Sequence, residues 1–204
     1  MTISAVKQYP VMEHFATIQG EGSYSGTPAY FIRLGGCDVG CHWCDVKDSW
    51  PIDSHPLMTT QELLGSVESS GLRTVVVTGG EPAMHDLTEL TNALKSSGIK
   101  CHIETSGTHP LTGSFDWVTF SPKKFKAPIE SFQGLANELK VIVFNRSDFE
   151  FAEQHKARMN SDTALYLQPE WEKRDEMTPL IIEYVKKNPE WNISIQAHKY
   201  MNIP

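Results

Sequence analysis

Three cysteines lie within eight positions of the chain, and their spacing could support metal chemistry. They are Cys37, Cys41 and Cys44 in the stretch GGCDVGCHWCDV (35–46), and the chain has one other cysteine, Cys101. A C-x3-C-x2-C loop can supply three corners of a cubane 4Fe-4S cluster, which leaves the fourth iron without a protein ligand. An iron with an open position can bind a substrate or a cofactor.

A structural zinc site is the alternative for the same cysteines. It would need a fourth ligand, for which His42, His102 and Cys101 are the candidates. His42 sits between two of the cysteines and is poorly placed to converge with them, and Cys101 lies on an apolar segment, as a small core residue would. A ferredoxin is not indicated, because electron carriers normally close the cluster with four cysteines.

Composition limits what the rest of the chain can be. The 204 residues are 40% hydrophobic, which predicts one sizeable core and a single domain over 1–204. The formal net charge is -7 and no basic run occurs, so a nucleic-acid partner is not indicated. No apolar run could span a bilayer, and MTISAVKQYP (1–10) lacks the apolar centre of a signal peptide, so we expect a cytoplasmic protein without a membrane partner. That compartment keeps thiols reduced, which favours metal or cluster chemistry over disulfides.

Short β-rich segments alternate with segments of helical period, which predicts an α/β fold with a mainly parallel sheet. Strands are expected at 29–36, 73–80, 99–106, 116–122, 137–144, 164–169 and 192–198. Helices are expected from a cap at Thr59 or Thr60 to Gly71, from Asp86 to Gly98, and over 147–158 and 178–187. Residues 45–58 contain two prolines and are expected to form a loop.

Reactive or small residues follow almost every expected strand. The stretches are GGC, TGGEP, ETSGT, SPKK, QPEW and QAHK. In open α/β sheets and barrels, ligands bind at the carboxyl ends of the strands. The sequence therefore predicts a site built from several short loops at one end of the sheet.

The cysteine spacing after the first expected strand, with Trp43 before the last cysteine, resembles the signature of the radical S-adenosylmethionine (SAM) superfamily. TGGEP (78–82) after the second strand strengthens the resemblance. It implies an incomplete (β/α) barrel in which SAM chelates the open iron and the GGEP loop holds its amino group. It also implies that one electron from the cluster cleaves SAM and that the resulting radical removes a hydrogen atom from the substrate.

A narrower resemblance covers nearly the whole chain. ATIQGEGSYSGTPAYFIRLGGC (16–37), TGGEP, ETSGT, SPK, ELK, LQP and the terminal QAHKYMNIP are similar, in this order, to the 7-carboxy-7-deazaguanine synthases. The resemblance implies a radical lyase that contracts 6-carboxy-5,6,7,8-tetrahydropterin to 7-carboxy-7-deazaguanine with loss of ammonia, in queuosine-type biosynthesis. It further implies a homodimer and an electron donor such as flavodoxin or ferredoxin.

Arg33 indicates a carboxylated substrate on grounds separate from the resemblance. It lies on a strand whose two faces are expected to be largely buried, so its charge needs an anion. A substrate carboxylate could accept two parallel hydrogen bonds from its planar guanidinium group. An internal salt bridge to one of the 25 acidic residues is the alternative.

The resemblance assigns further residues to the two ligands. Gln19 and Glu21, flanked by glycines, could pair with the amino-pyrimidinone edge of a pterin. The full set implied for the substrate is Ile18, Gln19, Gly20, Glu21, Arg33, Thr78, His198 and the terminal carboxylate of Pro204. For SAM, Gly80 and Glu81 are expected at the methionine part, and Ser106, Ser121, Pro122, Lys123, Gln168, Pro169, Glu170 and Trp171 around ribose and adenine. Lys140 could hold an internal charge or approach the cofactor carboxylate.

One residue departs from the family pattern. Many members carry Asp-Thr after the last cysteine, and the threonine hydroxyl helps to bind Mg2+ against the substrate carboxylate. Here the pair is Asp45-Val46, and valine offers no side-chain oxygen, so we expect weak or absent Mg2+ dependence. Two other functions stay open: a radical SAM activase acting on a partner protein's glycine, and a non-enzymatic zinc-binding module.

Overall fold

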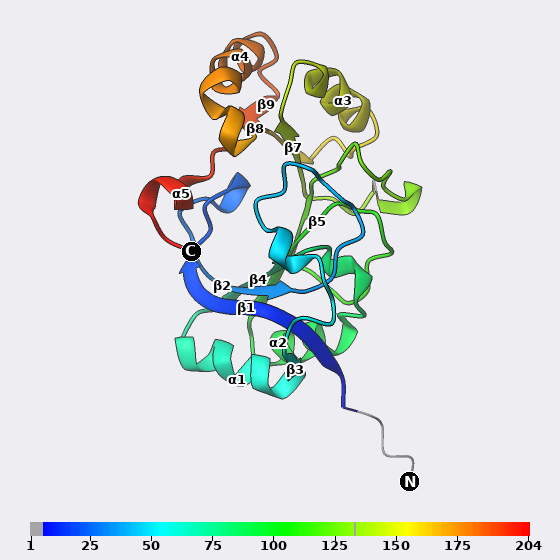
Figure 1. Ribbon diagram of the computed structural model, residues 1–204, viewed down its shortest axis with the longest axis vertical. Helices are drawn as coiled ribbons and strands as arrows, with labels where there is room; N and C mark the ends of the chain where they lie inside the picture. Colours follow the sequence, from blue (N-terminus) through cyan, green and yellow to red (C-terminus); the bar gives the residue numbers. More distant parts are fainter. Residues whose placement is uncertain (1–5, 133) are drawn as a thin grey trace.

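The computed structural model describes residues 6–132 and 134–204, and these residues contain one curved sheet of nine strands (Figure 1). Of the N-terminal stretch 1–10 considered above, residues 1–5 lie outside the described residues. The strands are β1 (Gln8–Ile18), β2 (Pro28–Leu34), β3 (Leu57–Thr59), β4 (Thr74–Gly79), β5 (Lys100–Thr105), β6 (Trp117–Phe120), β7 (Glu138–Val143), β8 (Ala164–Pro169) and β9 (Trp191–Ile193).

The sheet is mainly parallel and does not close. Its order is β3-β1-β2-β4-β5-β6-β7-β8-β9. Every neighbouring pair from β2 to β9 is parallel, whereas β1 is antiparallel to both β2 and β3. This arrangement confirms the expected incomplete barrel with a mainly parallel sheet.

Helices cover the outside of the curved sheet. They are α1 (Thr60–Ser70), α2 (Thr88–Ser96), α3 (Ser147–Lys156) and α4 (Arg174–Lys187), whereas the short α5 (Ala197–Met201) lies against the loop after β1. α2 packs on β5, α3 on β7, and α4 on β8 and β9. Figure 1 shows α1 and α2 at one end of the view and α3 and α4 at the other, with the blue-to-cyan loop after β2 between them.

Local chemistry explains where the helices begin and end. Thr59 caps α1 through a capping box, because its hydroxyl accepts from the Glu62 N–H at 3.2 Å and the Glu62 carboxylate accepts from the Thr59 N–H at 2.8 Å. Gly71 ends the helix at φ 73°, a left-handed conformation that glycine adopts without strain. Of the two caps weighed from the sequence, Thr59 is therefore the one used. α4 begins at Arg174, four residues before the expected start.

The buried hydrophobic side chains form one cluster that extends from Val11 on β1 to Trp191 on β9. The apolar face expected for α1 is buried there, with Leu63 and Val67 fully inaccessible, and burial stabilises such side chains by roughly 1.5–3 kcal/mol each. We propose that the chain is a single domain on this ground. No helix among the described residues is both long and apolar enough to cross a membrane.

Two features of the sheet differ from expectation. β1 and β3 are absent from the predicted strands; β1 carries Pro10 near its start and a bulge between Val11 and Glu13, which interrupt the alternation that marks a strand. The last strand stops at Ile193; of the residues expected to continue it, 194–196 form a loop and 197–198 begin α5. The chain leaves the sheet because the Ala197 N–H donates to the Gly20 carbonyl at 3.0 Å, across the site.

Candidate active site

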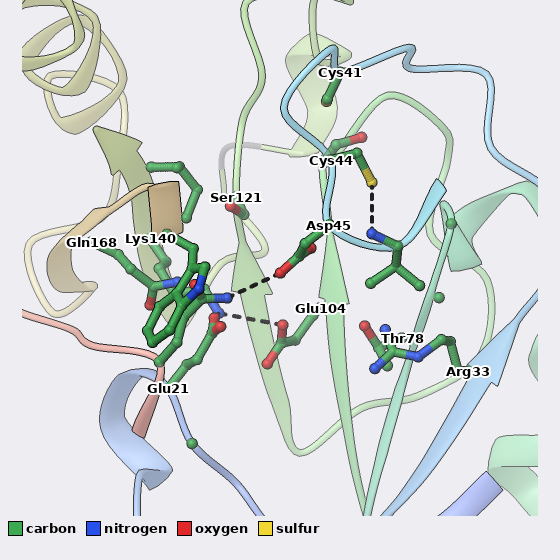
Figure 2. Close-up of a pocket in the computed structure, with 18 of the residues that line it drawn as sticks. Glu21, Arg33, Cys41, Cys44, Asp45, Thr78, Glu104, Ser121, Lys140 and Gln168 are labelled. Atoms are coloured by element: carbon green, nitrogen blue, oxygen red, sulfur yellow. Dashed lines mark hydrogen bonds and ion pairs between the residues drawn. The ribbon is translucent and has the colours of Figure 1, made fainter. Parts of the chain in front are cut away.

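A cavity of about 440 Å3 lies at the carboxyl ends of the parallel strands. This volume is typical of small-molecule and cofactor sites. Every residue predicted for the site lines the cavity except Pro122, which is buried directly after Ser121. In Figure 2, Arg33 and Thr78 lie on one side of Asp45 and Glu104, and Glu21, Lys140 and Gln168 on the other.

The cysteine loop folds back on itself beside this cavity. The Gly36 and Cys37 N–H groups donate to the carbonyls of Ser49 (2.7 Å) and Trp50 (3.1 Å). The Cys44 N–H donates to the Cys41 carbonyl at 3.0 Å, which tightens the turn between these two cysteines. Cys37, Cys41 and Cys44 all line the cavity and are free thiols.

The donor set fits a cluster bound by three cysteines. Cys44 Sγ accepts a hydrogen bond from the Val46 N–H at 3.4 Å, the kind of contact that tunes cluster sulfurs. Burial raises the pKa of Cys41 to about 11, so binding iron there must release a proton. Cys101 is fully buried in the core on β5, as expected of a structural residue. Within 6–132 and 134–204, no three Cys, His, Asp or Glu side chains converge closely enough to hold a single metal ion.

Gly80 explains how the TGGEP loop approaches the cysteine loop. A Cβ atom added at Gly80 would lie 2.3 Å from the Gly36 carbonyl oxygen and 2.7 Å from Cys37 Cβ, closer than real Cβ atoms come. The Gly80 N–H donates to the Leu34 carbonyl at 3.0 Å. A glycine is therefore required here for the backbone to reach the cysteines.

The Glu81 side chain is fully used by protein groups. Its carboxylate is 1% exposed and accepts from the N–H groups of Ala83 (3.0 Å) and Ser106 (2.8 Å), and from the hydroxyls of Thr105 and Ser106. The side chain thus binds the TGGEP loop to the ETSGT loop. A ligand near Glu81 would therefore meet the backbone of this residue and not its carboxylate.

The loop after β1 presents Gln19 and Glu21 from the opposite wall. Gln19 Nε2 donates to Glu104 Oε1 at 2.9 Å, and Glu21 Oε2 lies 2.5 Å from Lys140 Nζ. A Cβ atom on Gly20 would lie 2.3 Å from His198 Nδ1, so glycine allows His198 to pack directly on the loop. His198 therefore occupies the space beside Gly20 that a side chain would otherwise fill.

Arg33 has a protein partner as well as access to the cavity. Its Nε donates to Glu13 Oε1 at 2.6 Å, the internal salt bridge weighed as an alternative. Among the described residues, its two terminal nitrogens have no hydrogen-bond partner, and the side chain is 19% exposed. Glu13 thus fixes the guanidinium while leaving its outer edge for an anion. Phe31, on the same face of β2, stacks on Phe15 with ring centres 5.8 Å apart and lines the cavity beside it.

The two neighbouring lysines after β6 have different roles. Lys123 Nζ donates to the Ser121 carbonyl at 2.8 Å and to its hydroxyl at 2.5 Å, and burial lowers the pKa of this lysine. Lys124 instead pairs with Asp148 at 2.6 Å, outside the cavity. Only Lys123 therefore belongs to the site.

Most polar side chains of the 168–171 segment are engaged within the protein. Gln168 Oε1 accepts from the Ser194 hydroxyl at 2.6 Å, and the Glu170 carboxylate accepts from the Lys173 N–H at 3.1 Å. Trp171 keeps its ring at the cavity, with Lys199 Nζ 4.9 Å from the ring centre. This segment can meet a ligand through its backbone and the Trp171 ring.

Residues 194–204, here called the C-terminal strap, cross the cavity from β9 to the end of β1. Lys199 Nζ lies 2.6 Å from Asp45 Oδ2 in the cysteine loop. At the chain end, the Pro204 backbone oxygen accepts from the Thr17 hydroxyl at 3.0 Å, and Pro204 lines the cavity. Figure 1 shows the C-terminus beside the end of β1. The strap therefore links the cysteine loop, the loop after β1 and the Trp171 segment.

Sequence reasoning missed several cavity residues, among them Glu104, Gln196 and Lys199. Glu104 stands in the ETSGT stretch that was singled out, and its alternation on β5 could have placed it inside the barrel. Gln196 and Lys199 stand in the QAHK stretch that was also singled out, but the strand expected over 192–198 did not indicate that these residues lie on or beside α5.

Comparison with known proteins agrees with this geometry. Residues 31–125 match the Radical SAM superfamily model. Two relatives described as 7-carboxy-7-deazaguanine synthase, from Flavobacterium psychrophilum and Synechocystis, are 53% and 48% identical over 96% of this chain and cover 92% and 93% of their own. The crystal structure of QueE from Escherichia coli superposes with a TM-score of 0.84 at 38% identity, covering 94% of this chain and 95% of that chain.

The open parallel sheet and the three-cysteine loop after β2 make this protein a radical SAM enzyme, and the superfamily implies a 4Fe-4S cluster and SAM. The sequence identity to its relatives, over nearly their full length, narrows this class of enzyme to one family. The chain belongs to the 7-carboxy-7-deazaguanine synthase family.

Proposed function

We propose that the chain is a lyase that converts 6-carboxy-5,6,7,8-tetrahydropterin to 7-carboxy-7-deazaguanine with loss of ammonia, in queuosine-type 7-deazapurine biosynthesis. The observation that carries this proposal is a single cavity that holds the cysteine loop, the outer edge of Arg33 and the Glu21 carboxylate. Arg33 would receive the substrate carboxylate, and Glu21 would accept from the N–H groups of the amino-pyrimidinone edge. Membership in the family supports the same reaction.

The residues on the cavity wall divide between the two ligands. Cys37, Cys41 and Cys44 would hold the cluster, the Gly80 backbone would meet the methionine part of SAM, and Ser106, Ser121, Lys123 and the 168–171 segment would surround ribose and adenine. When bound, the cluster and SAM supply one-electron cleavage of a carbon–sulfur bond and removal of a hydrogen atom from the substrate. The protein's part is to orient the substrate against SAM and to exclude water, to which the C-terminal strap contributes.

The direct test is an anaerobic assay of the iron-reconstituted enzyme with SAM, a low-potential reductant and 6-carboxytetrahydropterin. We expect a product whose mass matches loss of ammonia and whose absorption matches a deazaguanine. Formation of 5'-deoxyadenosine with the pterin unchanged would overturn the substrate assignment while leaving the radical SAM assignment intact. Family membership does not favour the glycine activase or the zinc module.

Mg2+ dependence should be weak, because the residues near Val46 do not fit the ion. Valine offers no ligand, and the Asp45 carboxylate is already bound to Lys199 at 2.6 Å and to Gln196 Nε2 at 3.3 Å. Burial raises the pKa of Asp45, but the hydrogen bond and charge of Lys199 outweigh burial and leave the pKa below its ordinary value. We therefore expect turnover to persist in chelator and to rise little in a Mg2+ titration.

Val46→Thr is the companion variant for that titration. A hydroxyl at this position should make turnover depend more steeply on Mg2+, since it restores a family ligand. A wild-type enzyme that requires Mg2+ absolutely, with the same titration curve in Val46→Thr, would show that the ion binds elsewhere.

We also propose a homodimer and an electron donor of the flavodoxin or ferredoxin class, on the strength of the family resemblance. The cluster ligands lie in a loop with exposed residues such as His42, which would allow a donor protein to approach. Sedimentation of the purified protein tests the oligomeric state directly.

A further inference from the structure

Four ionisable side chains meet under the loop that presents Gln19 and Glu21. Lys140 on β7 is only 3% exposed, and its Nζ lies 2.5 Å from Glu21 Oε2 and 3.3 Å from Glu104 Oε2. Glu104 uses its other oxygen to accept from Gln19 Nε2 at 2.9 Å. Figure 2 shows Lys140 reaching toward Glu21 from its strand. A single buried ammonium is thus connected to both side chains assigned to the substrate's ring edge.

Glu138 contacts the backbone of the same loop. It precedes Lys140 by two residues on β7, so both side chains point into the barrel. Its Oε2 accepts from the Ser23 N–H at 2.9 Å, and a Cβ atom on Gly22 would lie 2.1 Å from its Oε1. Gly22 has φ 62°, so this close approach combines with a left-handed conformation that other residues adopt only with strain. Two side chains of β7 therefore contact the loop. Lys140 pairs with the Glu21 side chain, and Glu138 contacts the backbone of Gly22 and Ser23.

Charge makes Lys140 necessary for this arrangement. Three carboxylates surround it, and buried carboxylates with no cation nearby take up protons. Burial raises the pKa of Glu21, but the charge and hydrogen bond of Lys140 outweigh burial and lower that pKa to about 2. Glu21 is therefore ionised across the neutral range, and an ionised carboxylate offers only acceptors. It suits a ligand edge that presents neighbouring N–H donors.

We propose that Lys140 and Glu138 are positioning residues for substrate recognition: Lys140 fixes Glu21 directly and Gln19 through Glu104, and Glu138 fixes the loop backbone at Gly22 and Ser23. The receptor for the amino-pyrimidinone edge is then built before the substrate arrives. This inference rests on the proposed function, and it assigns Lys140 to an internal charge pair with a recognition role.

Lys140→Met tests the charge, because methionine keeps the length and apolar stem of the side chain. The unpaired Glu21 should then have a pKa raised by burial, and the acceptor is lost as pH falls through that pKa. We expect KM for the carboxypterin to rise roughly 10- to 100-fold, on the scale of a lost charge-assisted hydrogen bond, with the larger effect at acidic pH. The hydrogen bonds of Lys140 go to Glu21 and Glu104, so the change should appear in KM for the carboxypterin and in its pH dependence.

Several groups face Glu21 and must be followed in the pH profile. They are Lys140 and Glu138 on β7, Glu104 on β5, His198 in α5, Asp45 in the cysteine loop and Lys123 after β6. The background Glu21→Gln/Glu104→Gln separates them from the two carboxylates that pair with Lys140. If Lys140 acts through Glu21 and Glu104, adding Lys140→Met in that background should introduce no new pH dependence.

Three further variants and a control protect the test against simple misfolding. Lys140→Met/Glu104→Gln removes one unpaired carboxylate and should restore thermal stability while keeping the acid-sensitive KM. Glu138→Ala should raise KM severalfold, whereas Glu138→Gln, whose amide oxygen can still accept from Ser23, should restore it. Lys156→Met is the matched control, because Lys156 pairs with Glu153 and Glu190 on the surface, far from the cavity lining.

The outcomes are distinct. A wild-type enzyme that fails to bind the carboxypterin, measured by calorimetry with SAM present, would overturn the proposed function. A wild type that converts it, together with a folded Lys140→Met variant whose KM is unchanged and flat with pH, would overturn the positioning roles alone.

Discussion

Replacing Cys37, Cys41 or Cys44 by alanine is expected to abolish both iron loading and SAM cleavage. Each thiolate would hold one corner of the cluster, and three protein ligands leave no spare one to compensate for a loss. The three thiols line one cavity from one short loop, so no other cysteine can replace them. Bound iron per chain and the visible absorption of the reconstituted protein measure loading, and 5'-deoxyadenosine formation measures cleavage.

Cys101→Ala is the matched control and should keep both properties. Cys101 is fully buried on β5, and burial raises its pKa to about 12, so it remains an unreactive thiol of the core. The substitution leaves a small cavity and should lower the melting temperature slightly. An empty iron site in Cys101→Ala, in protein that is otherwise folded, would show that the three-ligand assignment is wrong.

Arg33→Lys is expected to weaken carboxypterin binding by roughly 1.5–3 kcal/mol, the scale of a hydrogen bond to a charged group. The contacts of Arg33 explain why lysine should not replace it. Arg33 can bind Glu13 through Nε and still offer its outer edge to an anion, whereas a lysine has one compact charge that Glu13 would attract. The variant would therefore keep the internal salt bridge and lose the two terminal guanidinium nitrogens that could bind the substrate carboxylate.

Calorimetry of carboxypterin binding in the presence of SAM measures this effect, and substrate-free SAM cleavage should survive in the variant. Arg73→Lys is the control, because the Arg73 side chain donates to the Ser97 carbonyl at 3.4 Å and Arg73 does not line the cavity. Unchanged affinity in Arg33→Lys would remove Arg33 from the substrate site and leave it as the partner of Glu13.

Local patterns were sufficient to predict the parallel strands and the loops that follow them. The strand from Thr74 to Gly79 and the TGGEP loop could be read directly, because a buried parallel strand is a short apolar run that ends at turn residues. The cap at Thr59 and the stop at Gly71 follow from rules that involve four neighbouring residues. These features depend on chemistry close in the chain.

Contacts between distant residues could not be predicted in the same way. Glu13 could not be identified as the partner of Arg33, because β1 was not predicted and its register with β2 was therefore unknown. Lys140 and Glu21 are 119 positions apart, and only the order of strands around the sheet brings them together. The internal use of the Glu81 carboxylate likewise depends on how β4 and β5 are aligned.

The C-terminal strap has a consequence for how the protein is made. Translation produces the cysteine loop well before Lys199 and Pro204, which bind Asp45 and Thr17. Because segments nearer the N-terminus can fold during synthesis, this side of the cavity stays open until residues 194–204 have been made and have packed against it. Delivery of the cluster to the cysteines can therefore precede closure of the wall that later shields it.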